Sequence, residues 1–158
     1  MAEILYLPQI EVFNIDSIEH LGGCLPHRGN YFTMLLAWDA PEIEQDKLIN
    51  LLQPLVDRGL AYFCAWGNKC SEMHDAVDLC AAKREQAFGP ADYLLMTTWH
   101  DDEPLEEALW FFEMCAIPSE DHVLADLERF AVAVGNSDWA VEMERMLAQS
   151  KEKQEEIE

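Results

Sequence analysis

The chain has 158 residues; half are hydrophobic, and 31 acidic against 10 basic side chains give a formal net charge of −21. This length predicts a single domain, and the many clustered apolar residues exclude a disordered chain. A pI near 4.3 disfavours binding to nucleic acid or anionic lipid, whereas it permits a basic protein partner or a cation.

The strands are predicted by short, nearly continuous apolar runs, which are typical of strands buried on both faces of a sheet. Residues 4–15 predict a further strand, and Pro8 would confine it to a sheet edge because proline cannot donate a ladder hydrogen bond. The four continuous runs cover residues 31–38, 61–66, 93–99 and 130–134.

Helical patterns alternate with these runs, at residues 41–58, 71–88, 104–117 and 138–150. Pro54 lies inside the first pattern and predicts a kink or an early end of that helix. Strands alternating with helices predict one three-layer αβα domain over residues 1–150, with a mostly parallel sheet of four or five strands, similar to the flavodoxin and Rossmann folds. Residues 1–30 would supply the edge strand and turns, and residues 151–158 a frayed, charged tail.

The expected location is the cytoplasm. No apolar run reaches the roughly 18 residues of a membrane span, and the first residues lack the basic region of a secretory signal. The five cysteines are odd in number and lie mostly in predicted regular structure. They are therefore predicted to be reduced thiols and not a disulfide framework.

A binding site is predicted at the loops that follow three of the strands, because ligands of parallel sheets bind beyond the carboxyl ends of the strands. Each of these loops begins at a tryptophan and continues with polar residues. The tryptophans could wall a pocket or anchor a protein interface, or they could cap the core of the sheet. The candidate binding residues here are Trp38, Asp39, Trp66, Asn68, Trp99 and Glu103.

The densest group of reactive side chains is His100-Asp101-Asp102-Glu103. An imidazole beside carboxylates could perform acid–base catalysis or bind a divalent metal. The carboxylates have a second interpretation, since they precede Pro104 and could cap the helix that begins there. Capping does not explain His100, which is therefore the first choice for a catalytic residue, with Asp101 or Asp102 beside it.

Cys70 and His74 lie four residues apart at the start of a predicted helix. A thiol at a helix N-terminus is expected to have a lowered pKa, so Cys70 is an alternative nucleophile. The pair could also form half of a zinc site, although no second pair of ligands is evident, and a structural role remains open. Phosphate-binding glycine motifs and the nucleophile elbow are absent from the sequence, so no cofactor is predicted.

The charge is concentrated in one segment. Between Arg84 and Arg129 there are twelve acidic residues and no basic residue. The segment includes the third predicted strand, the His100 loop, Glu106 and Glu107. A solvated face is the ordinary interpretation of such a run, but a field this one-sided would also attract a basic protein or a cation.

Two stretches, Cys64-Ala-Trp-Gly-Asn-Lys-Cys70 and Thr97-Thr-Trp-His-Asp-Asp-Glu-Pro-Leu-Glu-Glu107, resemble an uncharacterised bacterial domain family of unknown function. The resemblance covers about residues 30–147. It implies a bacterial origin and a shared pattern that includes Trp66, Cys70, His100 and Asp101. It implies no particular activity.

Two functional hypotheses follow. The first is a binding or inhibitory module for a basic protein, similar in kind to immunity proteins or nucleic-acid mimics, with Glu106 and Glu107 among its contact residues. The second is a small hydrolase or transferase that uses His100 with an aspartate, assisted in one version by a divalent metal. The sequence favours the first, because it combines a base-free acidic segment with an absence of catalytic signatures. It does not predict the oligomeric state.

Overall fold

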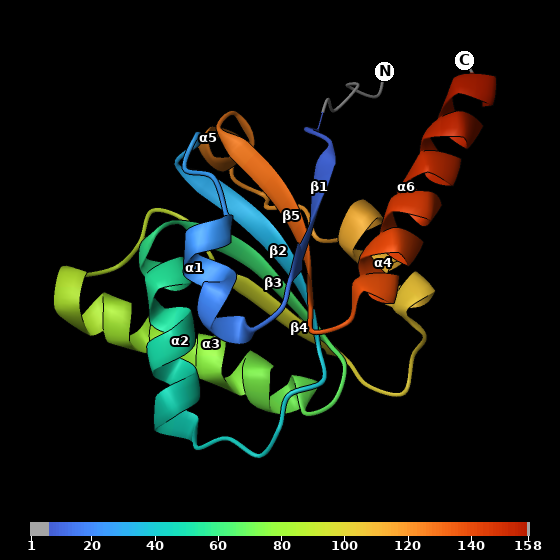
Figure 1. Cartoon of the computed structure of the whole chain (residues 1–158). Coiled ribbons are helices and arrows are strands. Elements are labelled where there is room, and N and C mark those ends of the chain that lie inside the picture. Colours follow the sequence, from blue (N-terminus) through green and yellow to red (C-terminus); the bar gives the residue numbers. More distant parts are fainter. Residues whose placement is uncertain (1–6, 158) are drawn as a thin grey trace.

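The computed structural model describes residues 7–157, which form a sheet of five parallel strands in the order β1-β5-β2-β3-β4 (Figure 1). The parallel α/β sheet predicted from the sequence is thus confirmed. The strands are Ile10–Ile15 (β1), Tyr31–Trp38 (β2), Leu60–Trp66 (β3), Met96–His100 (β4) and Leu127–Val134 (β5).

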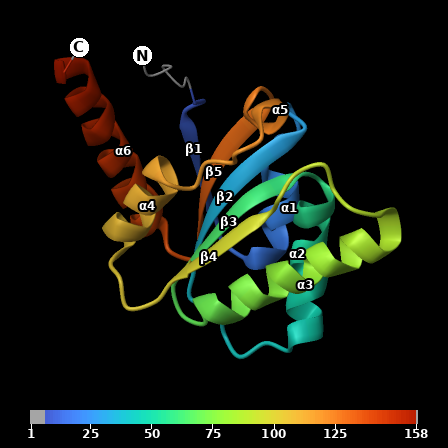
Figure 2. The same ribbon diagram turned by 180° about the vertical axis from the view of Figure 1, so that it is seen from behind.

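Helices cover both faces of the sheet, so the fold has three layers. Figures 1 and 2 show α1, α2 and α3 on one face and α4 and α6 on the other. No helix within residues 7–157 is both long enough and apolar enough to cross a bilayer. The helices are a 3-10 turn at Ile18–His20 (η1), Leu21–Cys24 (α1), Gln45–Asp57 (α2), Cys70–Phe88 (α3), Leu105–Met114 (α4), Asp121–Leu124 (α5) and Ser137–Ile157 (α6).

The path of the chain explains why the helices divide between the faces. From β2 the chain moves outward to β3 and β4, and it then crosses back to insert β5 between β1 and β2. Because crossovers between parallel strands are right-handed, reversing this direction places the connecting helix on the opposite face. The connection through α4 therefore lies on the face opposite α2 and α3.

The core consists of two apolar layers that share the central strands. In β2, Met34 and Leu36 face the layer of α2 and α3, while Leu35 and Ala37 face the layer of α4 and α6. All four side chains are fully buried. Because both faces of β2 are covered, its sequence is an unbroken apolar run and not an alternating one.

Several predicted element boundaries are wrong. Helix α2 does not end at Pro54 but continues to Asp57. The charged tail also continues as helix: α6 extends to Ile157 instead of ending near residue 150. The third predicted strand begins at Met96 and not at residue 93. There, the Leu94 amide donates a hydrogen bond to Glu120 Oε1 at 2.9 Å, outside any strand ladder.

The first predicted strand is confirmed as an edge strand, although it is shorter than expected. It begins at Ile10, and Pro8 precedes it. Residues 4–6 of the predicted strand lie outside the residues that the structure describes. The short helices η1, α1 and α5 were not expected from the sequence.

Candidate functional site

The loops that follow β2 and β3 are tied together at the carboxyl edge of the sheet. Gly67 has a φ of +112°, and a Cβ at this position would lie 2.3 Å from the carbonyl oxygen of Trp38. The Asn68 amide donates to Asp39 Oδ1 at 2.9 Å, and its side chain donates to the Ala40 carbonyl at 2.8 Å. Asp39 and Asn68, both predicted binding residues, therefore also hold the edge of the sheet in shape.

His100 lies at the end of β4 and is 6% exposed. Its Nδ1 is 3.1 Å from Glu103 Oε1, and its Nε2 is 3.0 Å from the Thr98 hydroxyl. The imidazole ring also packs against Phe111, with ring centroids 4.9 Å apart. Both ring nitrogens thus have a partner, and the partner carboxylate comes from Glu103 and not from Asp101 or Asp102.

Thr98 is a member of this arrangement that was not expected from the sequence. It precedes His100 by two residues on the same strand. Since side chains two apart on a strand project from the same face, that spacing was the available signal.

The capping interpretation of the carboxylates before α4 is wrong. Pro104 is the residue that precedes the first turn, and no side chain forms a capping hydrogen bond there. The acidic residues of the first turn are Glu106 and Glu107. Their negative charges interact favourably with the positive N-terminal end of the helix dipole. Asp101 and Asp102 are exposed, and Asp102 adopts a left-handed backbone conformation with a φ of 56°.

Cys70 is the first residue of α3 and is 2% exposed. Burial raises the pKa of its thiol, and the nearby Asp101 carboxylate raises it further. This is opposite to the expected effect of a helix N-terminus, so the prediction of a low-pKa nucleophile is wrong. The desolvation of the thiolate outweighs the helix dipole at this position.

His74 contacts aspartates and an aromatic ring on the outer side of α3. Its Nδ1 is 3.0 Å from Asp75 Oδ1, its Nε2 is 3.6 Å from Asp78 Oδ2, and its ring centroid is 4.6 Å from that of Trp99. Within residues 7–157 no group of three or more His, Cys, Asp or Glu side chains is arranged to hold a metal ion. Cys70 and His74 therefore gain no further metal ligands in this part of the chain.

The three tryptophans at the strand ends occupy different environments. Trp38 is buried, at 6% exposed, whereas Trp99 is 49% exposed. Trp66 donates from Nε1 to the Glu103 carbonyl at 2.8 Å and packs edge-on against Trp139. Trp66 thereby joins the loop before α4 to α6, and Trp99 is the one that presents a large apolar surface to solvent.

A hollow of about 380 Å³ lies where the loops after β1 and β5 leave for opposite faces of the sheet. This divergence is the position at which open parallel sheets bind ligands. Its walls include the carboxylates of Asp16, Glu19 and Asp39, which would repel a phosphate group. Trp38 and Asp39, two of the predicted binding residues, line this hollow. The contribution of the loops after β1 and β5 was not expected from the sequence, because it depends on β5 inserting beside β1; the polar residues Asp16 and Asn136 after each strand were the available signal.

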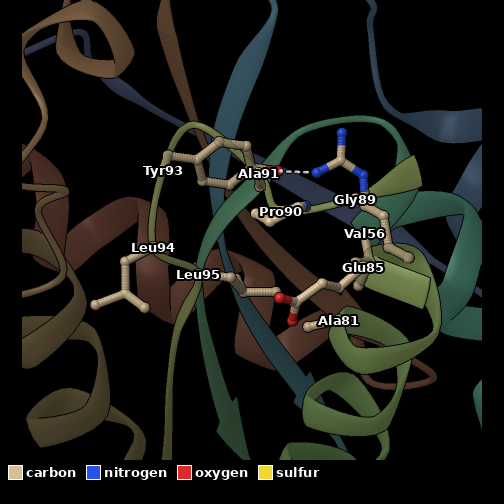
Figure 3. Close-up of a pocket in the computed structure, with 10 residues that line it drawn as sticks. Val56, Ala81, Glu85, Gly89, Pro90, Ala91, Tyr93, Leu94 and Leu95 are labelled. Atoms are coloured by element: carbon tan, nitrogen blue, oxygen red, sulfur yellow. Dashed lines mark hydrogen bonds between the residues drawn. The ribbon is translucent and has the colours of Figure 1, made fainter. Parts of the chain in front are cut away.

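A second hollow, of about 250 Å³, lies between the end of α3 and the segment that leads into β4 (Figure 3). Arg84 donates to the Tyr93 hydroxyl at 3.4 Å on one side of it, and Figure 3 shows Leu94 pointing away from the other lining residues. This volume is below the roughly 300 Å³ at which small-molecule sites begin, and it suits a single side chain.

The acidic segment between Arg84 and Arg129 also carries much of the exposed apolar surface. Among residues 7–157, six of the eight exposed large hydrophobic side chains lie in it. On α4, Trp110 is 61% exposed and Met114 is 50% exposed, and both follow Glu106 and Glu107 at helical spacing. The six side chains are Phe88, Leu94, Met96, Trp99, Trp110 and Met114.

Comparisons with known proteins place the chain in a family without assigning it an activity. A search of curated proteins and a search of solved structures each found no match. A family model described as a domain of unknown function, DUF7684, matches residues 13–150, which is most of the chain. The chain therefore belongs to this family of uncharacterised domains.

Proposed function

We propose that the protein binds a basic protein partner and masks or inhibits it, as immunity proteins and nucleic-acid mimics do. The contact surface would be the side built from β4, α4 and the loops around them. The observation that carries the proposal is the exposed Trp110, which stands on α4 within a segment that has twelve acidic residues and no basic one.

An exposed tryptophan among carboxylates suits recognition of lysine and arginine. Tryptophan is enriched among the residues that dominate interface energies, and its ring face attracts cations. The surrounding carboxylates of Glu106 and Glu107 would speed association and orient the partner. Met114, one turn beyond Trp110, would extend the apolar centre of the contact.

The test is an affinity enrichment from an extract of the producing organism, followed by a binding titration with the retained protein. We expect a basic protein to be retained by the wild type and by Val141→Ala, and to be lost with Trp110→Ala. Val141 is a matched control because it is 65% exposed and lies on α6, outside the acidic segment. The affinity should fall by about tenfold or more between 50 and 300 mM NaCl, since charge contributes to it.

Two results would contradict this proposal. One is that no protein is retained in a Trp110-dependent manner. The other is a Trp110-dependent partner that is acidic or neutral and binds equally well at both salt concentrations.

A second candidate function, hydrolysis or acyl transfer, is favoured by the contacts of His100. A carboxylate on Nδ1 and a hydroxyl on Nε2 is the arrangement that activates a hydroxyl nucleophile in acyl-transfer enzymes. In this proposal Thr98 would be the nucleophile, His100 the base and Glu103 the residue that orients it. A screen with activated esters should show turnover that His100→Ala abolishes and Thr98→Ser retains; no turnover, or turnover unaffected by His100→Ala, would rule this candidate out.

A further inference from the structure

We infer that the outer edge of β4 is a docking site for an extended, basic peptide segment, which adds to the sheet as a sixth strand. This inference rests on the proposed binding function and specifies how the partner would be held. In the part of the chain that the structure describes, β4 pairs with β3 on one side and no strand lies on the other. Half of its backbone N–H and C=O groups therefore point away from the sheet, where they can pair with another chain.

This edge is short, at five residues, but it lacks three of the features that prevent such pairing. Natural edge strands are protected by lysine, by proline or by β-bulges. The stretch from Met96 to His100 contains no lysine and no proline, and its register with β3 is continuous. The free stretch begins after Leu94, whose amide is already bonded to Glu120.

Apolar side chains accompany the edge on both faces of the sheet. Met96 is 42% exposed, and it projects from the same face of the sheet as His100, which packs on α4. Trp99 is 49% exposed and points to the other face, where it packs on His74 of α3. Side chains of an added strand would thus find a cross-strand partner on each face. The 250 Å³ hollow beside Leu95 in Figure 3 would accept one further side chain.

The carboxylates around β4 favour a basic peptide over an acidic or neutral one. On the α3 side, Asp78 accepts a hydrogen bond from the Thr97 hydroxyl at 2.8 Å while its side chain remains 52% exposed. Asp92 precedes the strand, and Asp101 and Asp102 follow it. A second copy of this chain would bring the same carboxylates to the same edge, so electrostatic repulsion disfavours self-pairing.

The experiment uses two peptides and the isotope-labelled full chain. The first probe is an acetylated octapeptide of alternating lysine and valine, and the second is the same peptide N-methylated at every internal amide, which cannot donate ladder hydrogen bonds. We expect the first to bind about tenfold or more tightly than the second. Chemical shift changes should centre on residues 95–100, and outward-facing amides of β4 should become protected from exchange.

Two charge-matched variants separate the edge from general electrostatics. Met96→Lys places a cation on the edge and should weaken binding of the first peptide by about tenfold. Val141→Lys makes the same charge change on α6 and should leave binding within about twofold of the wild type. Both side chains are at least 42% exposed, so neither variant disturbs the core.

The outcomes distinguish this inference from the function on which it rests. Equal binding of both peptides, or shift changes on α4 without changes on β4, would overturn the edge site while leaving a basic partner possible at Trp110. Failure of both peptides at millimolar concentration would also overturn it. The proposed function would be refuted separately, by the absence of any basic partner whose retention depends on Trp110.

Discussion

Arg129 is a buried cation that bonds to carbonyl groups. It is 5% exposed, and its Nη2 atom donates to the carbonyls of Phe112 at 3.2 Å and Glu113 at 2.6 Å. The last carbonyls of a helix have no partners within the helix, and its C-terminus carries partial negative charge. Burial lowers the pKa of Arg129, against an opposing effect of Glu113, but a guanidinium remains charged. Arg129 thus caps α4 from the neighbouring strand β5.

Truncation of Arg129 should be strongly destabilising. We expect Arg129→Ala to lower the free energy of unfolding by about 3 to 5 kcal/mol, because the two carbonyls would lose a charged donor in a buried setting. Arg129→Lys should cost less, since one ammonium can serve one of the two carbonyls. Urea unfolding measures both, with the exposed Arg145→Ala as a control expected to change stability by less than about 0.5 kcal/mol. A cost for Arg129→Ala as small as the control would show that this cap contributes nothing.

Cys64 makes stability sensitive to alkaline pH. It is fully buried, and burial raises the pKa of its thiol from 9.0 to about 12. Folding therefore favours the protonated thiol. This contribution is fully present below about pH 9 and is lost as the pH rises towards 12, because the unfolded chain ionises first.

The corresponding prediction concerns the slope of stability against pH. Between pH 8 and pH 10, ionisation of Cys64 in the unfolded chain should lower the free energy of unfolding of the wild type by about 1.4 kcal/mol. The Cys64→Ala variant should not show this decrease. Val77→Ala is the matched control, since it truncates another fully buried side chain that does not titrate. The prediction fails if Cys64→Ala and Val77→Ala show the same decrease between the two pH values.

The loop between β3 and α3 depends on the close approach of Gly67 to β2. A Cβ at Gly67 would collide with the backbone of Trp38, and the φ of +112° is unfavourable for any other residue. Lys69, at a φ of 61°, adds a second left-handed residue just before α3. The loop is thus shaped by backbone geometry as much as by the hydrogen bonds of Asn68.

Gly67→Ala should therefore destabilise the fold by about 2 to 4 kcal/mol, as backbone strain and collision add. Gly22→Ala is the matched control: a Cβ there would have no atom within 4 Å, and the residue belongs to α1. Alanine at this position should be neutral or stabilising by up to about 1 kcal/mol, since it favours the helix. Thermal or urea unfolding distinguishes the two; similar effects at both positions would mean that the loop adapts.

The sequence was informative about elements whose signals are local. The unbroken apolar run of residues 31–38 predicted β2 because helices on both faces require apolar side chains on both faces. The early helix end inferred at Pro54 was wrong, because α2 continues to Asp57 against the local preference of proline. The frayed tail inferred after residue 150 was also wrong, because its lysine, glutamate and glutamine residues are good helix formers. The hollow beside Asp16 and Asn136 was predicted only on the side of Trp38 and Asp39, since its other walls require β5 to insert next to β1. Likewise, the pKa of Cys70 depends on burial by segments distant in sequence.

The net charge of the molecule is unevenly distributed along the chain. The base-free segment supplies more than half of the net charge of −21. Among residues 7–157, the ion pairs of arginine and lysine reach this segment only at its last residue, Glu128, which Arg28 joins to Glu11; Lys69 bonds Glu42, outside the segment, at 2.7 Å. The carboxylates around β4 and α4 form no ion pair with arginine or lysine among residues 7–157, so they repel one another, and a basic partner would relieve this repulsion. Folding brings these charges closer together than they are in the unfolded chain, so this repulsion opposes the folded state.

This repulsion predicts that salt stabilises the protein in the absence of any partner. Two like charges 10 Å apart in water repel by about 0.4 kcal/mol, and several such pairs give a total on the order of 1 kcal/mol. Raising NaCl from 10 to 300 mM shortens the screening length from about 30 Å to about 6 Å. The free energy of unfolding, measured by urea titration, should rise by on the order of 1 kcal/mol over this range.

A variant that carries both Asp101→Asn and Asp102→Asn tests whether the effect originates in the acidic segment. Both carboxylates are exposed, and asparagine tolerates the left-handed conformation of residue 102, so the fold should be preserved. The neutral variant should be more stable than the wild type at 10 mM NaCl and should gain less from added salt. If salt instead lowered the stability of the wild type, the ion pairs of Arg28 and Lys69 would outweigh the repulsion. A neutral variant no more stable than the wild type at 10 mM NaCl would show that these two carboxylates cost the free protein nothing, and relief of their repulsion could then not contribute to binding a basic partner.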